Sequence, residues 1–202
     1  MIALDVETTG TDFEKHSILS IGAVSLFSPT EQFYGECRAF PGAHIEDRAL
    51  EVNGFSRESV LDESRQSEAE LVRAFLAWTH DQRDLTTVGQ NPSFDVRFIE
   101  AACRRGHLDF PLPHRSIDIH SLAFMHMTER GIPPPFDTAR RRSALNMDGA
   151  LRYCGIPEEP APHNALTGAL CHAEVAHRLL YGRGLLDDFT VFPVPWTVHK
   201  IQ

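Results

Sequence analysis

The sequence predicts an α/β fold in which a mixed five-stranded sheet is flanked by helices. Three strand-like segments in the first 40 residues, joined by short connections, predict an antiparallel meander. Helix-like and strand-like segments then alternate, which places helices on the faces of the sheet. A chain of 202 residues, 42% hydrophobic and 23% charged, has the size and composition of one globular domain.

The expected strands are short apolar segments that end at turn-forming residues. The first stops at a Thr-Thr-Gly turn, and the second alternates at period two from Ile21 onward, before Pro29 and Thr30 end it. The fourth ends at Gly89. Their expected ranges are residues 2–6, 18–26, 32–40, 85–88 and 117–119.

The expected helices carry apolar side chains at helical spacing. Ser67-Glu68-Ala69-Glu70 is a capping-box pattern, so a helix should begin after Ser67 and continue through Thr79. A second should run from Ser93 to near Gly106. Three more are expected through residues 120–127, 144–153 and 165–181.

We expect one domain over residues 1–185 and a C-terminal tail over residues 186–202, because no repeat or linker separates the elements. The chain opens on an apolar strand rather than on a basic segment followed by an apolar run. No stretch approaches 18 apolar residues. These features predict a cytoplasmic protein with no membrane partner.

The charge balance excludes one class of nucleic-acid-binding protein. Asp and Glu outnumber Lys and Arg by 28 to 19, which gives a net charge of −9. A protein that coats nucleic acid needs many cations to neutralise phosphates. An enzyme that meets phosphate through bound metal is not excluded, because its metal-binding carboxylates count as negative until the metal is added.

The first candidate site is Asp5-Val6-Glu7 at the end of the first strand. Residues two apart in a strand project from one face, so both carboxylates point together. A divalent cation such as Mg²⁺ or Mn²⁺ would offset their repulsion. The alternative is two solvated surface acids, although the hydroxyls of Thr8 and Thr9 beside the pair favour the metal site.

Asp95 and His163 are the other candidate site residues. Asp95 should lie in the first turn of a helix, where it could cap the helix or serve as a third carboxylate of a two-metal site. His163 lies where a loop meets a helix, and histidine titrates near neutral pH, as a general base should. The alternative is a surface or packing role, since the chain has 11 histidines.

Three motifs resemble, in order, those of the DEDDh branch of the DEDD 3′→5′ exonucleases. This branch includes the proofreading subunits of DNA polymerases, such as the DNA polymerase III epsilon subunit, and RNase T. The resemblance covers residues 1 to about 182. Its motifs are Asp5-Val6-Glu7-Thr8-Thr9-Gly10, Asn91-x-x-Phe94-Asp95 and His163-Asn164-Ala165-Leu166.

The resemblance implies that residues 1–185 form an exonuclease domain with an RNase H-like fold. It further implies a two-metal hydrolase of single-stranded DNA or RNA 3′ ends that releases nucleoside monophosphates. Asp5, Glu7 and Asp95 would bind two Mg²⁺ or Mn²⁺ ions, and His163 would deprotonate the attacking water. The implied substrate contacts are Thr8, Thr9 and Asn91. Phe55 is our candidate for stacking on a base.

One position departs from the family pattern. The family's fourth acid stands five residues after the histidine, where this chain has Gly168. Glu174 is six residues further along the helix, about 9 Å away, and cannot simply replace it. His172 lies one turn from Gly168 and could approach a metal, though imidazole is a poor ligand for Mg²⁺.

Three interpretations follow. The chain is an active exonuclease with a weakened second metal site, a weak or inactive module that binds 3′ ends within a polymerase or repair complex, or a variant of an otherwise ordinary enzyme. We favour the first, because the other motif residues remain. The second predicts that Gly168→Asp would switch cleavage on.

Two further features are interpreted without a motif. The run Arg140-Arg141-Arg142, with Arg130 and Arg152, could contact phosphates or simply balance an acidic surface. Asp118, just before an expected helix, is interpreted as a structural support for the site.

Overall fold

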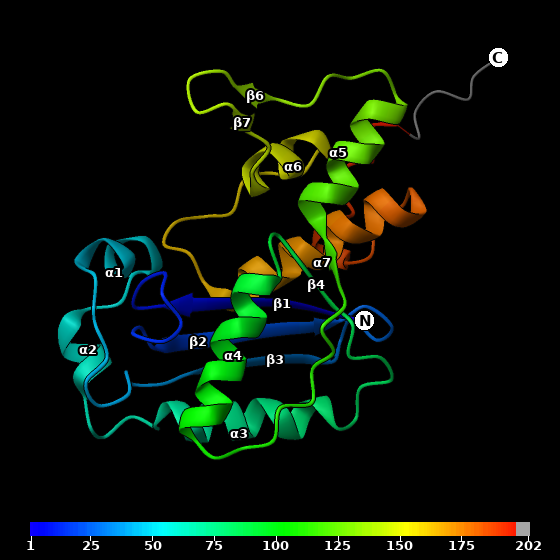
Figure 1. Ribbon diagram of the computed structural model, residues 1–202. Helices are drawn as coiled ribbons and strands as arrows, with labels where there is room; N and C mark the ends of the chain where they lie inside the picture. The colour runs from blue at the N-terminus through cyan, green and yellow to red at the C-terminus, as the bar shows by residue number, and fades with distance from the viewer. Residues whose placement is uncertain (197–202) are drawn as a thin grey trace.

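The computed structural model describes residues 1–196 and contains a five-stranded mixed sheet flanked by helices (Figure 1). The strand order is β3-β2-β1-β4-β5. The strands β1, β2 and β3 pair antiparallel, whereas β4 pairs parallel to both β1 and β5. The bounds are β1 Ile2–Thr8, β2 Ile18–Ser25, β3 Gln32–Glu36, β4 Thr87–Gly89 and β5 Ser116–Asp118. The predicted fold class and meander are thus confirmed.

The third strand is shorter than expected because its backbone leaves the ladder after Glu36. The Cys37 amide donates to Leu19 O at 2.8 Å, and the Ala39 amide donates to Val60 O at 2.8 Å. The second of these partners lies in a helix rather than in the sheet. Residues 37–40 therefore form a connection and not the end of a strand.

Five of the seven α-helices match the expected segments. The Ser67 capping box opens α3 as predicted, with the Glu70 amide donating to the Ser67 hydroxyl at 3.3 Å. The bounds of the five are α3 Glu68–Thr79, α4 Ser93–Arg105, α5 Ile119–Glu129, α6 Met147–Tyr153 and α7 Ala165–Tyr181.

Three short elements were not anticipated. Two are the helices α1, Asp47–Asn53, and α2, Arg57–Leu61, which lie beside the end of β1 (Figure 1). The third is a hairpin of β6, Phe136–Asp137, and β7, Arg142–Ser143, within the arginine-rich loop. Each is too short to produce a clear hydrophobic period, so tertiary contacts rather than sequence pattern define it.

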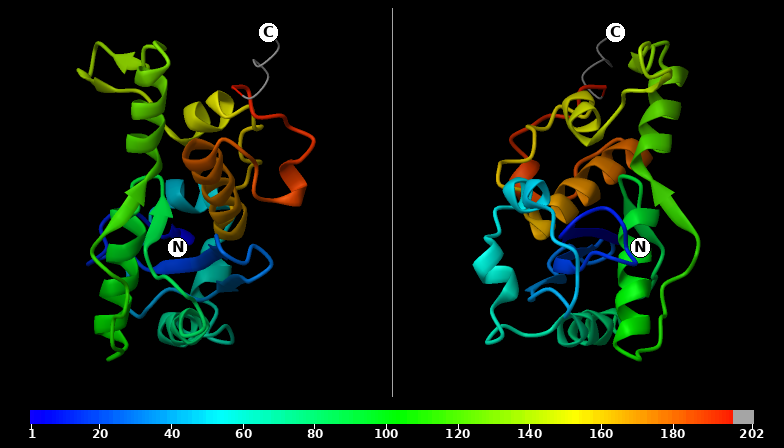
Figure 2. Two further views of the ribbon diagram at one scale, coloured as in Figure 1. Left: turned by 90° about the vertical axis from the view of Figure 1, so that its right-hand side faces the viewer. Right: turned by 60° about the vertical axis from the view of Figure 1, so that its left-hand side comes forward.

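The sheet divides the core into two layers. The helix α7 covers the face over β1, β2 and β4, whereas α3 and α4 cover the opposite face (Figures 1 and 2). In β1, Ile2, Leu4 and Val6 pack in the core on the α3 and α4 side, and Ala3 packs on the α7 side. Because side chains alternate along a strand, Asp5 and Glu7 share the face of Ala3 and point toward the start of α7.

A glycine lets α7 approach this face closely. Gly22 of β2 pairs with Asp5 of β1, and a Cβ atom at Gly22 would lie only 2.0 Å from Ala165 O at the start of α7. A larger residue would push the helix away from the sheet. The separation between β1 and α7, and with it the depth of the site, depends on this contact.

Part of the expected C-terminal tail packs against the body of the protein. The short helix η1 spans Asp187–Phe189, and Trp196 packs against Tyr153 with ring centroids 5.3 Å apart. The end of the expected tail, residues 197–202, lies outside the described residues. Within the described part of the chain, no helix is long and apolar enough to cross a membrane.

Candidate active site

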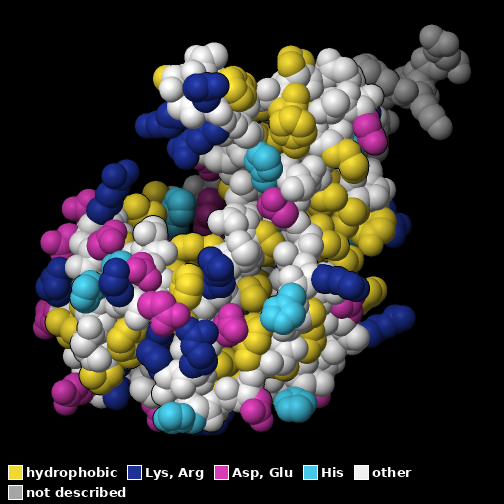
Figure 3. All heavy atoms as spheres, in the orientation of Figure 1, with side chains coloured by type: hydrophobic (Ala, Val, Ile, Leu, Met, Phe, Trp, Pro, Cys, Tyr) yellow, Lys and Arg dark blue, Asp and Glu magenta, His cyan; other side chains and the backbone are white. Residues whose placement is uncertain are grey.

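The three predicted acids, the predicted histidine and Gly168 line one cavity of about 260 Å³. The cavity lies where β1 ends, between the first turn of α4 and the first turn of α7. Figure 3 shows a hollow between the surface over α1 and α2 and the surface over α6 and the β6–β7 hairpin, with acidic and histidine side chains at its floor. Residues separated by more than 150 positions are thereby brought together.

The backbone holds the acids in place. Asp5 and Glu7 project from the same face of β1, as the period of the strand requires. Asp95, which is only 3% exposed, lies in the first turn of α4, where its Oδ1 accepts a hydrogen bond from the Val6 amide at 3.1 Å. This bond ties the start of α4 to the strand that carries the other two acids.

Burial and mutual repulsion raise the pKa of all three acids. For Asp5, burial raises the pKa well above its usual value, with contributions from the charges of Asp95, Glu7 and Glu159. Burial, with a contribution from Glu159, raises the pKa of Glu7 to about 7. Burial raises the pKa of Asp95 to about 8. Keeping these three acids ionised side by side costs free energy, and a bound cation would offset that cost.

His163 reaches the cavity from the segment that precedes α7. Its backbone amide donates to Val52 O in α1 at 3.0 Å, and its side chain is exposed. Asn164 caps α7, with its side-chain oxygen accepting from the Leu166 amide at 3.0 Å. An exposed imidazole on an anchored backbone can reach a water molecule at the mouth of the cavity.

The oxygen donors fit divalent metal ions in their chemistry. Hard carboxylate oxygens suit Mg²⁺ and Mn²⁺. The Oε1 atom of Gln90, which also lines the cavity, is buried and has no hydrogen-bond partner among residues 1–196. Within the same residues, no group of three or more His, Cys, Asp or Glu side chains is placed so as to hold a metal ion. The acids therefore line one cavity without forming a ready-made metal site.

In the structure, neither His172 nor Glu174 is free to replace the missing acid as a metal ligand. His172 uses both ring nitrogens within the fold: Nδ1 contacts Leu4 O at 2.9 Å, and Nε2 accepts from the Gln90 amide at 3.5 Å. Burial lowers the pKa of His172 to about 4, so it is neutral. Glu174 is fully buried and binds Arg178 at 2.6 Å. Both side chains have structural roles.

The predicted substrate contacts separate into two groups. Thr8 lines a neighbouring cavity of about 270 Å³ beside Glu7, and Asn91 lines the cavity of the acids. Thr9 does not line either cavity. It is fully buried, and its hydroxyl donates to His44 O at 2.6 Å and accepts from the Ser17 amide at 2.9 Å. Its hydroxyl is thus hydrogen-bonded within the fold, and its role as a substrate contact stays a prediction.

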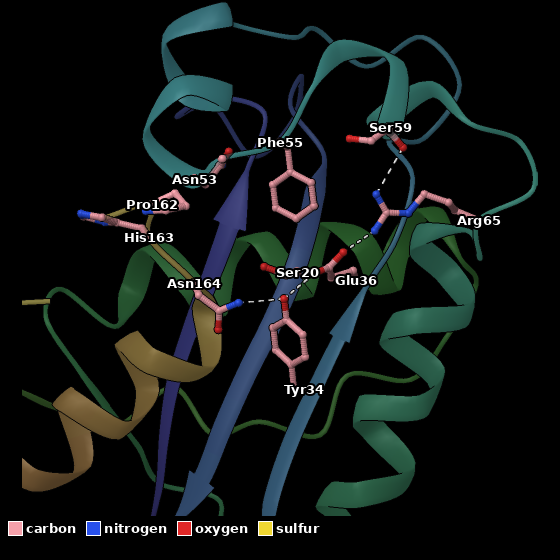
Figure 4. A pocket seen from close by; sticks show the side chains of 11 residues that line it. Ser20, Tyr34, Glu36, Asn53, Phe55, Ser59, Arg65, Pro162, His163 and Asn164 are labelled. Carbon is pink, nitrogen blue, oxygen red and sulfur yellow. Dashed lines mark hydrogen bonds and ion pairs between the residues drawn. The ribbon is translucent and has the colours of Figure 1, made fainter. Parts of the chain in front are cut away.

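Phe55 lines a different cavity from the acids. Figure 4 shows it beside Tyr34 and Arg65, in a cavity of about 300 Å³ that is bordered on one side by His163. The Arg65 guanidinium lies 5.7 Å from the centroid of the Phe55 ring. The expected stacking residue is thus next to the site but separated from the acids by the His163 segment.

The structure also shows where Asp118 and the arginine-rich loop lie. Asp118 caps α5, with Oδ1 accepting from the Asn91 amide and the His120 amide at 3.1 Å each, so it supports the loop of Asn91 as expected. Figure 3 shows Lys and Arg side chains on the β6–β7 hairpin above the hollow. Arg140 pairs with Asp137 at 3.3 Å.

Sequence reasoning missed Glu159 and Gln90, which line the cavity of the acids, and Asn53, which lines the neighbouring cavity beside Glu7. Glu159 precedes the histidine motif by four residues, in an acidic and proline-rich stretch that gave a weak signal. Gln90 follows a strand and belongs to no motif. Asn53 is the last residue of the unanticipated α1, and its side-chain amide donates to Thr8 O at 3.1 Å.

Comparisons with known proteins agree with this geometry. Residues 2–176 match the model of the exonuclease family of RNase T type. The chain is 32% identical over 127 residues to the 3′-5′ DNA exonuclease Cap18 of Escherichia coli, covering 61% of this chain and 67% of that protein. It is 26% identical over 178 residues to ribonuclease T of Yersinia pseudotuberculosis, covering 77% and 83% of the two chains.

Solved structures share the fold. Product-bound exonuclease I superposes with a TM-score of 0.70 at 17% identity, over 90% of this chain but 43% of that chain, so this protein spans less than half of exonuclease I. The nuclease domain of 3′hExo, a DEDDh family member bound to rAMP, superposes with a TM-score of 0.68 at 16% identity, over 92% and 93% of the two chains. Since the family model spans most of the chain, the protein belongs to the RNase T-type exonuclease family, with the RNase H-like fold of the DEDDh 3′→5′ exonucleases.

Proposed function

We propose that this protein is a metal-dependent 3′→5′ exonuclease that hydrolyses single-stranded DNA or RNA ends to nucleoside monophosphates. The observation that carries the proposal is the single cavity lined by Asp5, Glu7, Asp95 and His163. Membership of the exonuclease family supports it. Both DNA and RNA stay within the proposed substrate class, since the relatives include a DNA exonuclease and a ribonuclease.

In this proposal Asp5, Glu7 and Asp95 hold two divalent ions. Bound ions would lower the pKa of a water molecule and offset the charge that develops on the phosphate. The chain's own contribution is to keep three carboxyl groups facing one space, with Asp95 buried and Asp5 and Glu7 half-buried, which the backbone of β1 and the Val6–Asp95 hydrogen bond accomplish. Because the pKa values of these acids are raised, metal ions compete with protons for their oxygens.

The role proposed for His163 is to accept the proton of the attacking water at an imidazole nitrogen. Imidazole is the side chain suited to taking up and releasing a proton near neutral pH. The exposed side chain can approach and leave the cavity without breaking a buried contact. It can therefore return the proton to bulk water after each cycle.

The terminal nucleotide is proposed to lie beside Glu7. The cavity of about 270 Å³ next to the acids is lined by Thr8, Ala49, Val52 and Phe94, which offer an apolar surface to a base. The ligand of this cavity would be the 3′ end of a single strand, and exonuclease I, which shares this fold, has been solved with a dT13 oligonucleotide.

We place the reaction in the cytoplasm. A polymerase or repair partner is a separate prediction, which co-purification would test.

The competing proposal, an inactive module that binds 3′ ends, has less support. The relatives Cap18 and ribonuclease T are named as nucleases rather than as binding modules. Acids that raise one another's pKa would also be a costly arrangement for a surface that needs no metal.

The decisive experiment is release of monophosphates from a 5′-labelled single-stranded oligonucleotide with Mg²⁺ or Mn²⁺. We expect stepwise shortening from the 3′ end, its abolition by EDTA, and a loss of at least about 100-fold in rate for Asp5→Asn. Asp188→Asn, at an exposed position of η1, removes the same charge away from the cavity and should leave the rate unchanged. No release with either ion would overturn the proposal.

A further inference from the structure

We propose that Glu159 supplies the fourth metal-binding carboxylate of the active site, in place of the acid that the chain lacks at position 168. The inference rests on the proposed function. It assigns the ligand to the loop between α6 and α7 rather than to α7 itself. Glu159 lines the same cavity as Asp5, Glu7, Asp95 and Gly168.

The first support is that position 168 has no room for a side chain. A Cβ atom on Gly168 would lie 2.3 Å from Asp5 Oδ2 and 2.8 Å from Asp5 Cγ. Heavy atoms that are not bonded cannot approach so closely, so even alanine would require Asp5 to move. As packed, the helix comes nearer to Asp5 than a helix carrying an acid at this position could unless the Asp5 carboxylate rotated, so a fourth carboxylate that leaves Asp5 in place comes from elsewhere.

The second support is the position of Glu159 on the wall of the cavity. Its side chain lines the same space of about 260 Å³ as Asp5, Glu7 and His163. The Asn164 amide, next to His163 at the start of α7, donates to the carboxylate of Glu159. Glu159 therefore borders the space shared by the two β1 acids and the proposed base, where a fourth ligand is needed.

The third support is that Glu159 keeps coordinating capacity. Its Oε1 accepts one long hydrogen bond, from the Asn164 amide at 3.4 Å. Within residues 1–196 no Lys, Arg or His nitrogen lies within 4 Å of its carboxylate. Its neighbour Glu158 is instead exposed and paired with Arg152. A half-buried carboxylate without an ion-pair partner is free to bind a cation.

A neutral donor completes the set. Gln90 Oε1 is buried, unpaired within the described residues, and belongs to a side chain that lines the same cavity. Such an atom normally has a hydrogen-bond donor or a metal as its partner. Carboxylates from β1, α4 and the α6–α7 loop, with this amide oxygen, surround the space from several directions.

The test measures Mn²⁺ binding to the full chain by isothermal titration calorimetry, with no substrate present, in parallel with the rate of oligonucleotide cleavage. We expect Glu159→Gln to weaken Mn²⁺ binding by about 10-fold or more, or to remove one of the bound ions, and to slow cleavage to a similar degree. Glu158→Gln is the matched control: it removes one carboxylate charge from the adjacent residue and should change neither quantity.

Three outcomes would overturn the inference. If the wild type binds Mn²⁺ and cleaves, and Glu159→Gln matches it in Mn²⁺ affinity, the fourth ligand is not Glu159. If that variant binds Mn²⁺ normally but shifts the pH–rate profile, Glu159 positions His163 instead. If the wild type neither binds Mn²⁺ nor cleaves, the proposed function fails, and this inference fails with it.

Discussion

The carboxylate of Asp5 fills the space that a side chain at position 168 would need, since a Cβ atom there would be 2.3 Å from Asp5 Oδ2. The glycine is therefore part of the geometry of the site, because it allows α7 to pack against the acid-bearing face of β1. Restoring an acid at this position would not restore an ordinary site. It would displace the acid that is already there.

Substituting Gly168 tests this relationship. We expect Gly168→Ala and Gly168→Asp both to slow cleavage by about 10-fold or more, because Asp5 must rotate away from its place. The unfolding temperature should change little in Gly168→Ala, since alanine in a helix gains about 1 kcal/mol and the clash opposes this gain. Gly149→Ala in α6, where a Cβ atom would approach the Leu145 side chain to 3.2 Å, is the comparison variant for alanine in a helix away from Asp5. Faster cleavage by Gly168→Asp would contradict the prediction.

The stability of the metal-free protein should fall as pH rises. The pKa of Asp95 is raised from 3.8 to about 8, so the folded chain holds a proton that the unfolded chain has lost between these values. This group's contribution is complete below pH 4 and is lost as pH rises toward 8. In EDTA, we expect the unfolding temperature to drop by several degrees, at about 2–4 °C per kcal/mol, between pH 5.5 and 8.5.

Asp95→Asn should flatten this pH dependence, because the amide keeps an acceptor for Val6 and carries no charge. Mg²⁺ should raise the unfolding temperature of the wild type more at pH 8.5 than at pH 5.5, since protons compete with the metal for the same oxygens. Differential scanning fluorimetry measures both effects. An unfolding temperature that rises with pH in EDTA would contradict the raised pKa.

Replacing His163 should separate catalysis from metal binding. His163→Ala should lower kcat by about 10²–10⁴-fold, the usual contribution of a general base, and leave Mn²⁺ affinity unchanged. His114→Ala, at an exposed position outside the cavities, is the control. Retention of a wild-type rate would exclude His163 as the base.

The β6–β7 hairpin should bind phosphates of the incoming strand. Arg141 and Arg142 are exposed, and no carboxylate of residues 1–196 lies within 4 Å of either. Replacing both with alanine should raise KM for long oligonucleotides. It should also make the oligonucleotide-binding constant less sensitive to salt: the slope of its logarithm against the logarithm of the salt concentration should fall by about 0.7 for each phosphate that is no longer bound. Arg73→Ala, on the exposed side of α3, is the control. Equal salt slopes would contradict the prediction.

Arg178, which is 1% exposed, should hold the last segment of the described chain in place and stabilise the fold. Its guanidinium binds Glu174 at 2.6 Å and donates to Cys154 O at 2.9 Å and to Phe192 O at 2.8 Å. Arg178→Met should lower the free energy of unfolding by about 3–5 kcal/mol, because it leaves a buried charge unpaired. Urea unfolding measures the loss, and adding Glu174→Gln should recover part of it. A loss below about 1 kcal/mol would contradict this role.

The local sequence pattern was sufficient to predict the larger helices and strands. The alternation of Ile21 and its neighbours predicted β2, the Ser67 capping box predicted the start of α3, and both lie where expected. The short helices α1 and α2 could not be predicted, because their buried apolar residues Leu50 and Val60 acquire partners only when Leu19 of β2 and Ala39 lie beside them. The hydrogen bonds of the Thr9 hydroxyl with Ser17 and His44 could not be predicted for the same reason, since sequence alone does not bring these residues near.

The sequence by itself predicted the family, the order of the sheet's first strands and the candidate site residues, three acids and one histidine, because a strand's period of two and three ordered motifs are local properties. It also showed that the fourth acid is missing from α7. Only the tertiary structure decided what this means. The packing of α7 on β1 leaves no space at Gly168, and the fold of the α6–α7 loop brings Glu159 to the cavity. Distances across the fold depend on packing, which no local pattern encodes.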